Sequence, residues 1–139
     1  MTIAYPIDST RRRHGVQLTF PDFPEASTQC AVGEEFHAAT ACLVDVLEGY
    51  VRGRRAIPRP SHALRRPVVP PPVLVAAKVA LYNEMRRRKL SNVALAKQLG
   101  SVEGTVRRLL DLRHRSHVDQ VEAALELLGK RLVVSSRRL

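Results

Sequence analysis

The residues with the clearest chemical potential lie between Asn92 and Asp111, in the stretch Asn-Val-Ala-Leu-Ala-Lys-Gln-Leu-Gly-Ser-Val-Glu-Gly-Thr-Val-Arg-Arg-Leu-Leu-Asp. The guanidinium of Arg108 could donate two parallel hydrogen bonds to a guanine, and the carboxylate of Glu103 could accept one from a cytosine amino group. A single arginine is equally compatible with a solvated surface cation. The residues around the arginine therefore have to show whether it binds DNA or is a solvated surface cation.

The spacing of small, flexible and β-branched residues in this stretch predicts a helix-turn-helix. Such a motif needs a small residue where two helices cross, a glycine with left-handed φ in the turn, and a β-branched residue that packs the second helix on the first. Ala96, Gly100 and Val106 meet these requirements, although an ordinary helical hairpin would also accommodate them. The N-terminal part of the second helix faces the base edges in this motif. We therefore expect base contacts from Val102, Glu103, Gly104, Thr105, Arg107 and Arg108, and phosphate contacts from Asn92, Arg113 and Arg115.

Helical periodicity surrounds this motif throughout the C-terminal half of the chain. Ser91 can cap the N-terminus of one helix, and Gly100 and Gly129 stand where two helices should end. The predicted helices run over about residues 75–88, 91–99, 102–111 and 118–128.

The last apolar residues, Leu132, Val133 and Val134, predict a short strand over residues 131–135. An isolated strand is unstable in water, so we expect it to pair with a second copy of the chain. The C-terminal domain would then form a homodimer or a higher homo-oligomer. The alternative is that this segment packs back on its own helices.

The N-terminal half predicts the order β-β-β-α. Apolar residues alternate with other residues over 3–7 and 16–20, and residues 26–30 suggest a third strand. Residues 8–15, which include three consecutive arginines, are interpreted as an exposed hairpin loop. Helical spacing then extends from Gly33 to Arg52, with Gly53 where a C-terminal cap belongs.

A proline-rich segment separates the two halves. Residues 53–72 hold six of the nine prolines, which predicts a stiff linker and domain boundaries at 1–55, 56–72 and 73–139. The net charge of +10 is uneven, because residues 1–52 carry −3 and residues 73–139 carry +8. This asymmetry predicts a polyanionic partner for the C-terminal part and a different, basic partner for the N-terminal part.

No group of side chains predicts catalysis, a metal site or a cofactor. Asp8, Asp22 and Asp45 fall on a loop, a turn and a helix, whereas metal-dependent hydrolysis needs several convergent carboxylates. Cys30 and Cys42 lack the spacing of a zinc site, and we expect both to be reduced and buried. No apolar run is long enough to span a membrane. The sequence therefore predicts a soluble, cytoplasmic protein that is not an enzyme.

Short motifs in both halves of the chain are similar to those of one known family. The N-terminal motifs are Tyr5-Pro6-Ile7, the run from Gly15 to Phe20-Pro21-Asp22-Phe23-Pro24, and Ile57-Pro58-Arg59-Pro60-Ser61. The C-terminal motifs lie at residues 79–82, 108–112, 122–125 and 128–132. Together they resemble the HicB antitoxins, whose C-terminal half is an Xre-type DNA-binding domain. Glu25 and Val32 depart from the glycine and threonine that are usual in this family.

This resemblance implies an α+β protein in which a small antiparallel sheet with one helix, a partial RNase H-like fold, is joined by the proline-rich linker to an all-α helix-turn-helix domain. It also implies an antitoxin of a type II toxin–antitoxin system. The N-terminal domain would cover the catalytic site of a HicA-like mRNA endonuclease toxin, with Asp22, Phe23 and Glu25 at the toxin surface. The C-terminal domain would bind double-stranded operator DNA and repress the shared operon. A stand-alone transcriptional regulator with a ligand-sensing domain and a residual nuclease are the alternatives.

Overall fold

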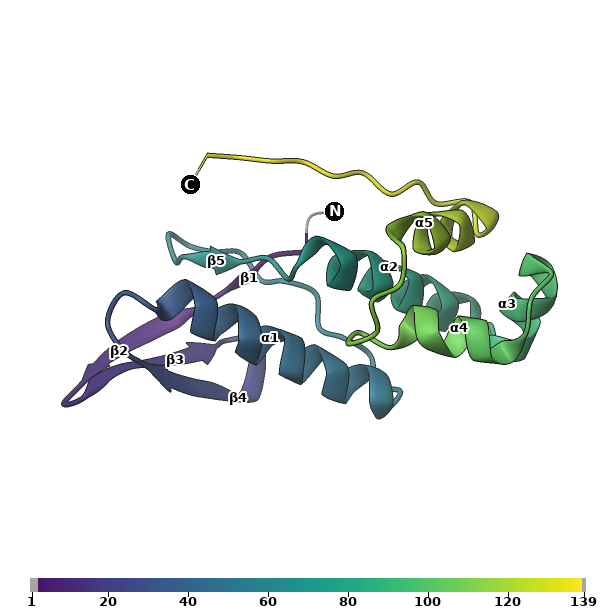
Figure 1. Ribbon diagram of the computed structural model, residues 1–139. Coiled ribbons are helices and arrows are strands. Elements are labelled where there is room, and N and C mark those ends of the chain that lie inside the picture. The colour runs from purple at the N-terminus through teal and green to yellow at the C-terminus, as the bar shows by residue number, and fades with distance from the viewer. Residues whose placement is uncertain (1–2, 139) are drawn as a thin grey trace. The chain divides into compact units, whose positions relative to one another are not determined.

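The computed structural model describes residues 3–138 (Figure 1). The chain is an α+β protein that consists of two compact units. Unit 1 extends to Pro72 and unit 2 begins at Val73. Among residues 3–138, the strands all lie in unit 1, and unit 2 contains only helices and coil. Within the described residues, no helix has both the length and the apolar content needed to cross a membrane.

Unit 1 is built on a three-stranded antiparallel sheet in the order β2-β3-β4, formed by Asp8–Arg12, Gly15–Phe20 and Phe23–Cys30. Helix α1, Glu35–Arg52, packs against this sheet (Figure 1). Side chains of β3 alternate as expected, because Val16, Leu18 and Phe20 are buried. The alternation in the sequence therefore predicted β3 correctly.

Strand β2 corrects the expected hairpin loop over residues 8–15. All five of its residues are exposed, yet Asp8 pairs with Thr19 and Arg12 pairs with Gly15 across a regular antiparallel register. Only Arg13 and His14 form the turn. The strand escaped prediction because it has no apolar face, and its backbone pairing with β3 defines it instead.

The proline-rich segment does not behave as a free linker over residues 56–72, because much of it is attached to unit 1. Strand β5, Val68–Val69, pairs antiparallel with β1, Tyr5–Pro6, in a separate two-stranded sheet. The Tyr5 hydroxyl also donates a hydrogen bond of 2.7 Å to the Pro58 carbonyl. Proline prevents helix formation here, but it leaves carbonyl groups that can accept hydrogen bonds from the rest of the unit.

Helix α1 ends close to the expected position, but its cap differs in detail. Gly53 is the C-cap residue with a right-handed φ of −79°, and the following Arg54 adopts the left-handed φ of 54°. A Cβ atom at Gly53 would lie 3.2 Å from the Gly49 carbonyl oxygen. Close approach of the backbone, rather than a positive φ, is therefore the reason for glycine at this position.

Unit 2 contains α2 (Val73–Arg88), α3 (Asn92–Leu99), α4 (Glu103–Leu110) and α5 (Val118–Leu127). The four predicted helices are confirmed to within a few residues at their ends. An aliphatic cluster from all four helices forms the core, and its fully buried members are Ala77, Leu81, Leu95, Val106, Val121 and Ala124.

The expected strand over residues 131–135 is absent from the described part of a single chain. Residues 130–138 are extended coil, and Val133 and Val134 are 81% and 64% exposed. Leu132 alone is partly buried, against the core cluster of unit 2. A strand needs a partner strand, and residues 131–135 pair with no other strand among the described residues of one chain.

Candidate nucleic-acid interface

The unit formed by α3, a short turn and α4 has the local geometry that its sequence predicts. The Ser91 hydroxyl accepts a hydrogen bond of 3.1 Å from the Ala94 amide and caps α3. Gly100 adopts a left-handed φ of 66°, which lets the Ser101 amide donate to the Ala96 carbonyl at 2.9 Å. Ala96 and Val106 are both buried. The two helices therefore meet through a small residue and a β-branched residue.

The first turn of α4 is organised by an ion pair. The Arg107 guanidinium donates to the Glu103 carboxylate, and the Asn92 side chain adds a further hydrogen bond to the same group. These donors, with Arg107 first, lower the pKa of Glu103. Glu103 is consequently charged at neutral pH and holds Arg107 along the helix surface.

Arg108 has a different environment, because it lies beside the only glycine of α4. A Cβ atom at Gly104 would be 3.7 Å from the Arg108 guanidinium, at an ordinary contact distance. Arg108 itself is exposed. The missing side chain at position 104 therefore leaves the helix backbone open next to an exposed cation.

The remaining residues expected at DNA lie on or beside the same elements. Val102 is the exposed N-cap residue of α4, and the Thr105 hydroxyl accepts a hydrogen bond of 2.9 Å from Ser101. Arg113 and Arg115 lie in the loop 111–117 that follows α4, and both are exposed. The structure thus places all nine residues on the first turn of α3, on α4 and its N-cap, and on the loop after α4.

Two buried charges on α2 were missed by the sequence analysis. Lys78 is fully buried, and its ammonium is surrounded by oxygen atoms of α4 and of the loop 111–117. Burial lowers the pKa of Lys78, while the nearby Asp111 carboxylate opposes this shift. The available signal was a charged residue within an apolar helix face, because Lys78 lies between Val75 and Tyr82.

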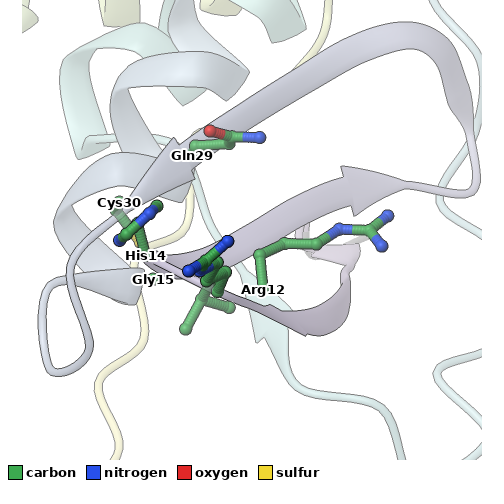
Figure 2. Close-up of a pocket in the computed structure, with 7 residues that line it drawn as sticks. Arg12, His14, Gly15, Gln29 and Cys30 are labelled. Carbon is green, nitrogen blue, oxygen red and sulfur yellow. The ribbon is translucent and has the colours of Figure 1, made fainter.

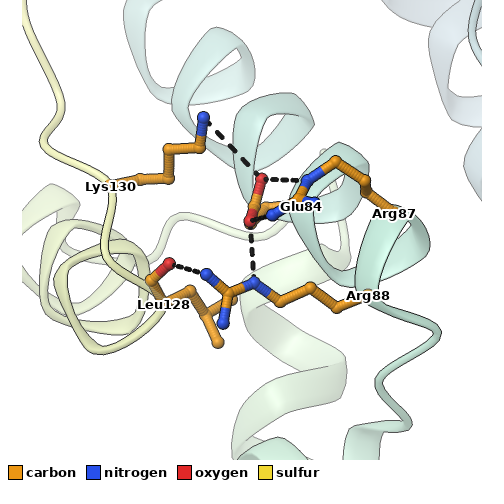
Figure 3. Close-up of polar contacts among 5 residues, drawn as sticks. All are labelled: Glu84, Arg87, Arg88, Leu128 and Lys130. Carbon is orange, nitrogen blue, oxygen red and sulfur yellow. Dashed lines mark hydrogen bonds and ion pairs between the residues drawn. The ribbon is translucent and has the colours of Figure 1, made fainter.

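Glu84 forms the second buried charge, and it connects the end of α2 to the end of α5 (Figure 3). Its side chain is 6% exposed and contacts Arg87 at 2.6 Å, Arg88 at 2.8 Å and Lys130 at 4.0 Å. Arg88 also donates a hydrogen bond to the Leu128 carbonyl. Hydrogen bonds from Arg87 and then Arg88 lower the pKa of Glu84 to about 2. The cluster thus fixes the start of the C-terminal tail, defined here as residues 130–138.

The three residues expected at the toxin surface have structural contacts within unit 1. Phe23 is 0% exposed and packs against Tyr5 and Tyr50, with ring centroids 4.8 Å and 5.5 Å apart. The Asp22 carboxylate accepts hydrogen bonds from the Ser61 amide at 3.0 Å and from its hydroxyl. Glu25 is exposed, and hydrogen bonds from its own backbone amide and then from Tyr50 lower its pKa. Of the three, Glu25 is exposed, Asp22 is half-buried and Phe23 is buried.

A hollow of about 500 Å³ lies at the tip of the β2–β3 hairpin (Figure 2). Its lining includes Arg12, Arg13 and His14, which are exposed, and Cys30, which is half-buried. Arg12 is engaged by the Gln17 side chain at 2.6 Å. Burial, and then Glu35 and Glu34, raise the pKa of the Cys30 thiol. The hollow is therefore a basic surface feature without a buried polar group.

Two of the three carboxylates considered for metal-dependent hydrolysis bind other side chains or backbone groups of unit 1. Asp8 pairs with Arg66 at 2.8 Å, and Asp22 holds Ser61. Among residues 3–138, no three His, Cys, Asp or Glu side chains are grouped to hold a metal ion. Both cysteines are unpaired and half-buried.

Comparison with known proteins identifies the class to which this arrangement belongs. The family model described as the HicB-like antitoxin of bacterial toxin–antitoxin systems matches residues 4–80. Antitoxin HicB 2 of Photorhabdus laumondii is 37% identical over 129 residues, which cover 92% of each chain. Antitoxin HicB of Escherichia coli is 32% identical over 131 residues, 92% of this chain and 95% of its own. Antitoxin HicB of Pseudomonas fluorescens is 36% identical over 119 residues, 76% of this chain and 82% of its own.

These similarities extend through both units of the chain. The protein belongs to the HicB-like antitoxin family, the antitoxins of bacterial toxin–antitoxin systems.

Proposed function

We propose that this protein neutralises a HicA-like mRNA endonuclease toxin through unit 1 and represses its own operon through unit 2. Unit 2 would act as an Xre-type helix-turn-helix domain on double-stranded operator DNA. The observation that carries this proposal is the α3–turn–α4 geometry, with left-handed Gly100 and buried Ala96 and Val106. The exposed arginines of α4 and of the loop after it supply the cations that phosphates and base edges require.

The DNA-binding half of the proposal predicts the effect of removing both α4 arginines. Arg107→Ala/Arg108→Ala should abolish sequence-specific binding to the upstream DNA, because each good base contact contributes about 1–3 kcal/mol. Both side chains are exposed, so helicity by circular dichroism should not change. Binding at wild-type strength in a gel-shift assay would exclude α4 as the groove-reading helix.

For the toxin-binding half, unit 1 would act as a partial RNase H-like scaffold in a cytoplasmic complex. Residues 1–52 carry a net charge of −3, which complements a basic toxin. Glu25 would contact the toxin directly, since it is exposed. Phe23 and Asp22 would contribute by shaping the surface, through the aromatic cluster and the Ser61 contact.

Dimerisation would involve the C-terminal tail. The backbone of residues 131–138 is extended, and the exposed Val133 and Val134 offer apolar side chains to a symmetric strand from a second copy. Two operator half-sites about 34–36 Å apart require two recognition helices related by a two-fold axis, and such a dimer would supply them.

The alternative function is a stand-alone regulator that senses a ligand with unit 1, and the hollow at the hairpin tip is the feature that favours it. Co-expression with the adjacent gene, followed by copurification, distinguishes the two. An antitoxin should retain the toxin on a tagged fragment of residues 1–72, whereas a stand-alone regulator should retain nothing. The fragment must include the proline-rich segment, because its Ser61 and Val69 are bonded to the rest of unit 1.

A further inference from the structure

Helix α2 holds a buried cation whose position is defined by four oxygen atoms. The Lys78 ammonium lies 2.9 Å from the Arg108 carbonyl, 2.7 Å from the Asp111 carbonyl and 2.8 Å from the His114 carbonyl. Its fourth neighbour is the Ser116 hydroxyl, at 2.9 Å. A buried ammonium is costly unless its three donors are satisfied. Here every donor has an acceptor, so the surrounding backbone is arranged around the charge.

The four acceptors belong to two successive parts of the chain. Arg108 is in the last turn of α4, where its carbonyl also accepts a hydrogen bond of 3.3 Å from the C-cap amide of Asp111 and where a cation is favourable. Asp111, His114 and Ser116 belong to the loop 111–117 between α4 and α5. One side chain therefore fixes both the end of α4 and the path of the following loop.

The same loop carries Arg113 and Arg115, two of the expected phosphate contacts. Arg113 lies between two residues whose carbonyls bind Lys78, and Arg115 is flanked by His114 and Ser116. The backbone of both arginines is consequently held from inside unit 2 while their side chains remain exposed. Cations fixed in this way lose less conformational entropy when they bind phosphates.

We propose that Lys78 is a positioning residue for DNA recognition: its buried ammonium holds the end of α4 and the loop 111–117 so that Arg113 and Arg115 meet the phosphate backbone. This inference rests on the proposed DNA-binding function. Each of the three carbonyl groups also accepts a hydrogen bond from a backbone amide two or three residues later, so the loop has local bonds of its own. Without the ammonium, the bonds that tie the end of α4 and the loop to α2 would be lost, and the loop could move away from α2. The arginines would then leave their positions although neither had been substituted.

The test is Lys78→Met, which keeps an unbranched apolar stem and removes the donors. In fluorescence anisotropy titrations with the upstream duplex, we expect about tenfold weaker binding. The slope of log K against log salt should become less steep by about two, the value for two lost phosphate contacts. Lys97→Met makes the same change in net charge at an exposed position of α3 and should alter the slope by less than one.

A double-mutant cycle separates positioning from loss of stability. In an Arg113→Ala/Arg115→Ala background, Lys78→Met should cost almost no further affinity, because the groups through which it acts are already gone. An equal loss in both backgrounds, or a folded Lys78→Met protein with the wild-type affinity and slope, would overturn the inference.

If Lys78→Met does not fold, Lys78→Gln provides the test, since its amide is polar and keeps two donors but lacks the charge and the third donor. We expect about threefold weaker binding and a less steep salt slope, and wild-type values would refute the role of Lys78. Wild-type protein that bound no upstream DNA at any salt concentration would instead overturn the proposed function, and this inference with it.

Discussion

Replacing Gly104 by alanine should raise the stability of unit 2 and weaken its DNA binding at the same time. Gly104 lies in the first turn of α4 with a helical φ, and a Cβ atom there meets only the Arg108 guanidinium, at 3.7 Å. Alanine is favoured over glycine in a helix by about 0.5–1 kcal/mol. At the first turn we expect about 0.5 kcal/mol, or roughly 2–4 °C in Tm for a unit of this size.

The effect on DNA has the opposite sign for a steric reason. If α4 enters the major groove, the new methyl group occupies the open backbone surface that faces the bases and keeps the helix from approaching them as closely. Loss of one base contact corresponds to about 1–3 kcal/mol, so we expect operator affinity to fall about tenfold. General destabilisation of the unit cannot produce a higher Tm together with weaker binding.

Thermal denaturation followed by circular dichroism measures the first effect, and anisotropy titration at fixed salt measures the second. Gly49→Ala is the matched control, because Gly49 is in α1 of unit 1 and a Cβ atom there meets nothing within 4 Å. It should stabilise unit 1 and leave DNA binding unchanged. Wild-type operator affinity in the Gly104→Ala protein would refute the placement of this turn at the DNA.

Three further predictions concern the contacts that hold each unit together. Because the folded pKa of Glu84, about 2, lies below its ordinary value of 4.5, its ion pairs stabilise unit 2 above pH 4.5 and are lost as the pH falls toward 2. Glu84→Gln should lower the free energy of unfolding by about 2 kcal/mol at pH 7, as measured by urea titration, and have little effect at pH 2; an equal loss at both pH values would contradict the ionic role. Asp22→Ala removes the acceptor for the Ser61 amide and hydroxyl and should destabilise unit 1 by about 1–2 kcal/mol in the same assay, whereas an unchanged midpoint would mean that the proline-rich segment contributes nothing there. Deleting residues 131–139 should give a monomer in light scattering, weaken operator binding and leave toxin binding unchanged. A dimer that persists after the deletion would indicate that the interface lies on α5 instead.

The sequence by itself determined the elements whose signals are local. The four helices of unit 2 follow from apolar periodicity, from Ser91 as an N-cap and from Gly100 and Gly129 as left-handed terminators. These signals act within one or two turns of chain, so their outcome does not depend on distant partners. For the same reason, the spacing of Ala96, Gly100 and Val106 was sufficient to predict the two helices and the turn between them from the sequence.

Only the tertiary structure decided the features that depend on residues far apart in the chain. Strand β2 has no apolar alternation and exists because β3 supplies its hydrogen bonds. The proline-rich segment is part of unit 1 because Tyr5 and Asp22, more than thirty positions away, bind its backbone. By charge alone, nothing in the sequence distinguishes Lys78 from the other cations of a basic chain. In the folded unit, oxygen atoms from residues 108–116 surround its ammonium. Propensity and spacing describe what a segment prefers alone, whereas burial and long-range hydrogen bonds depend on which other segments fold against it.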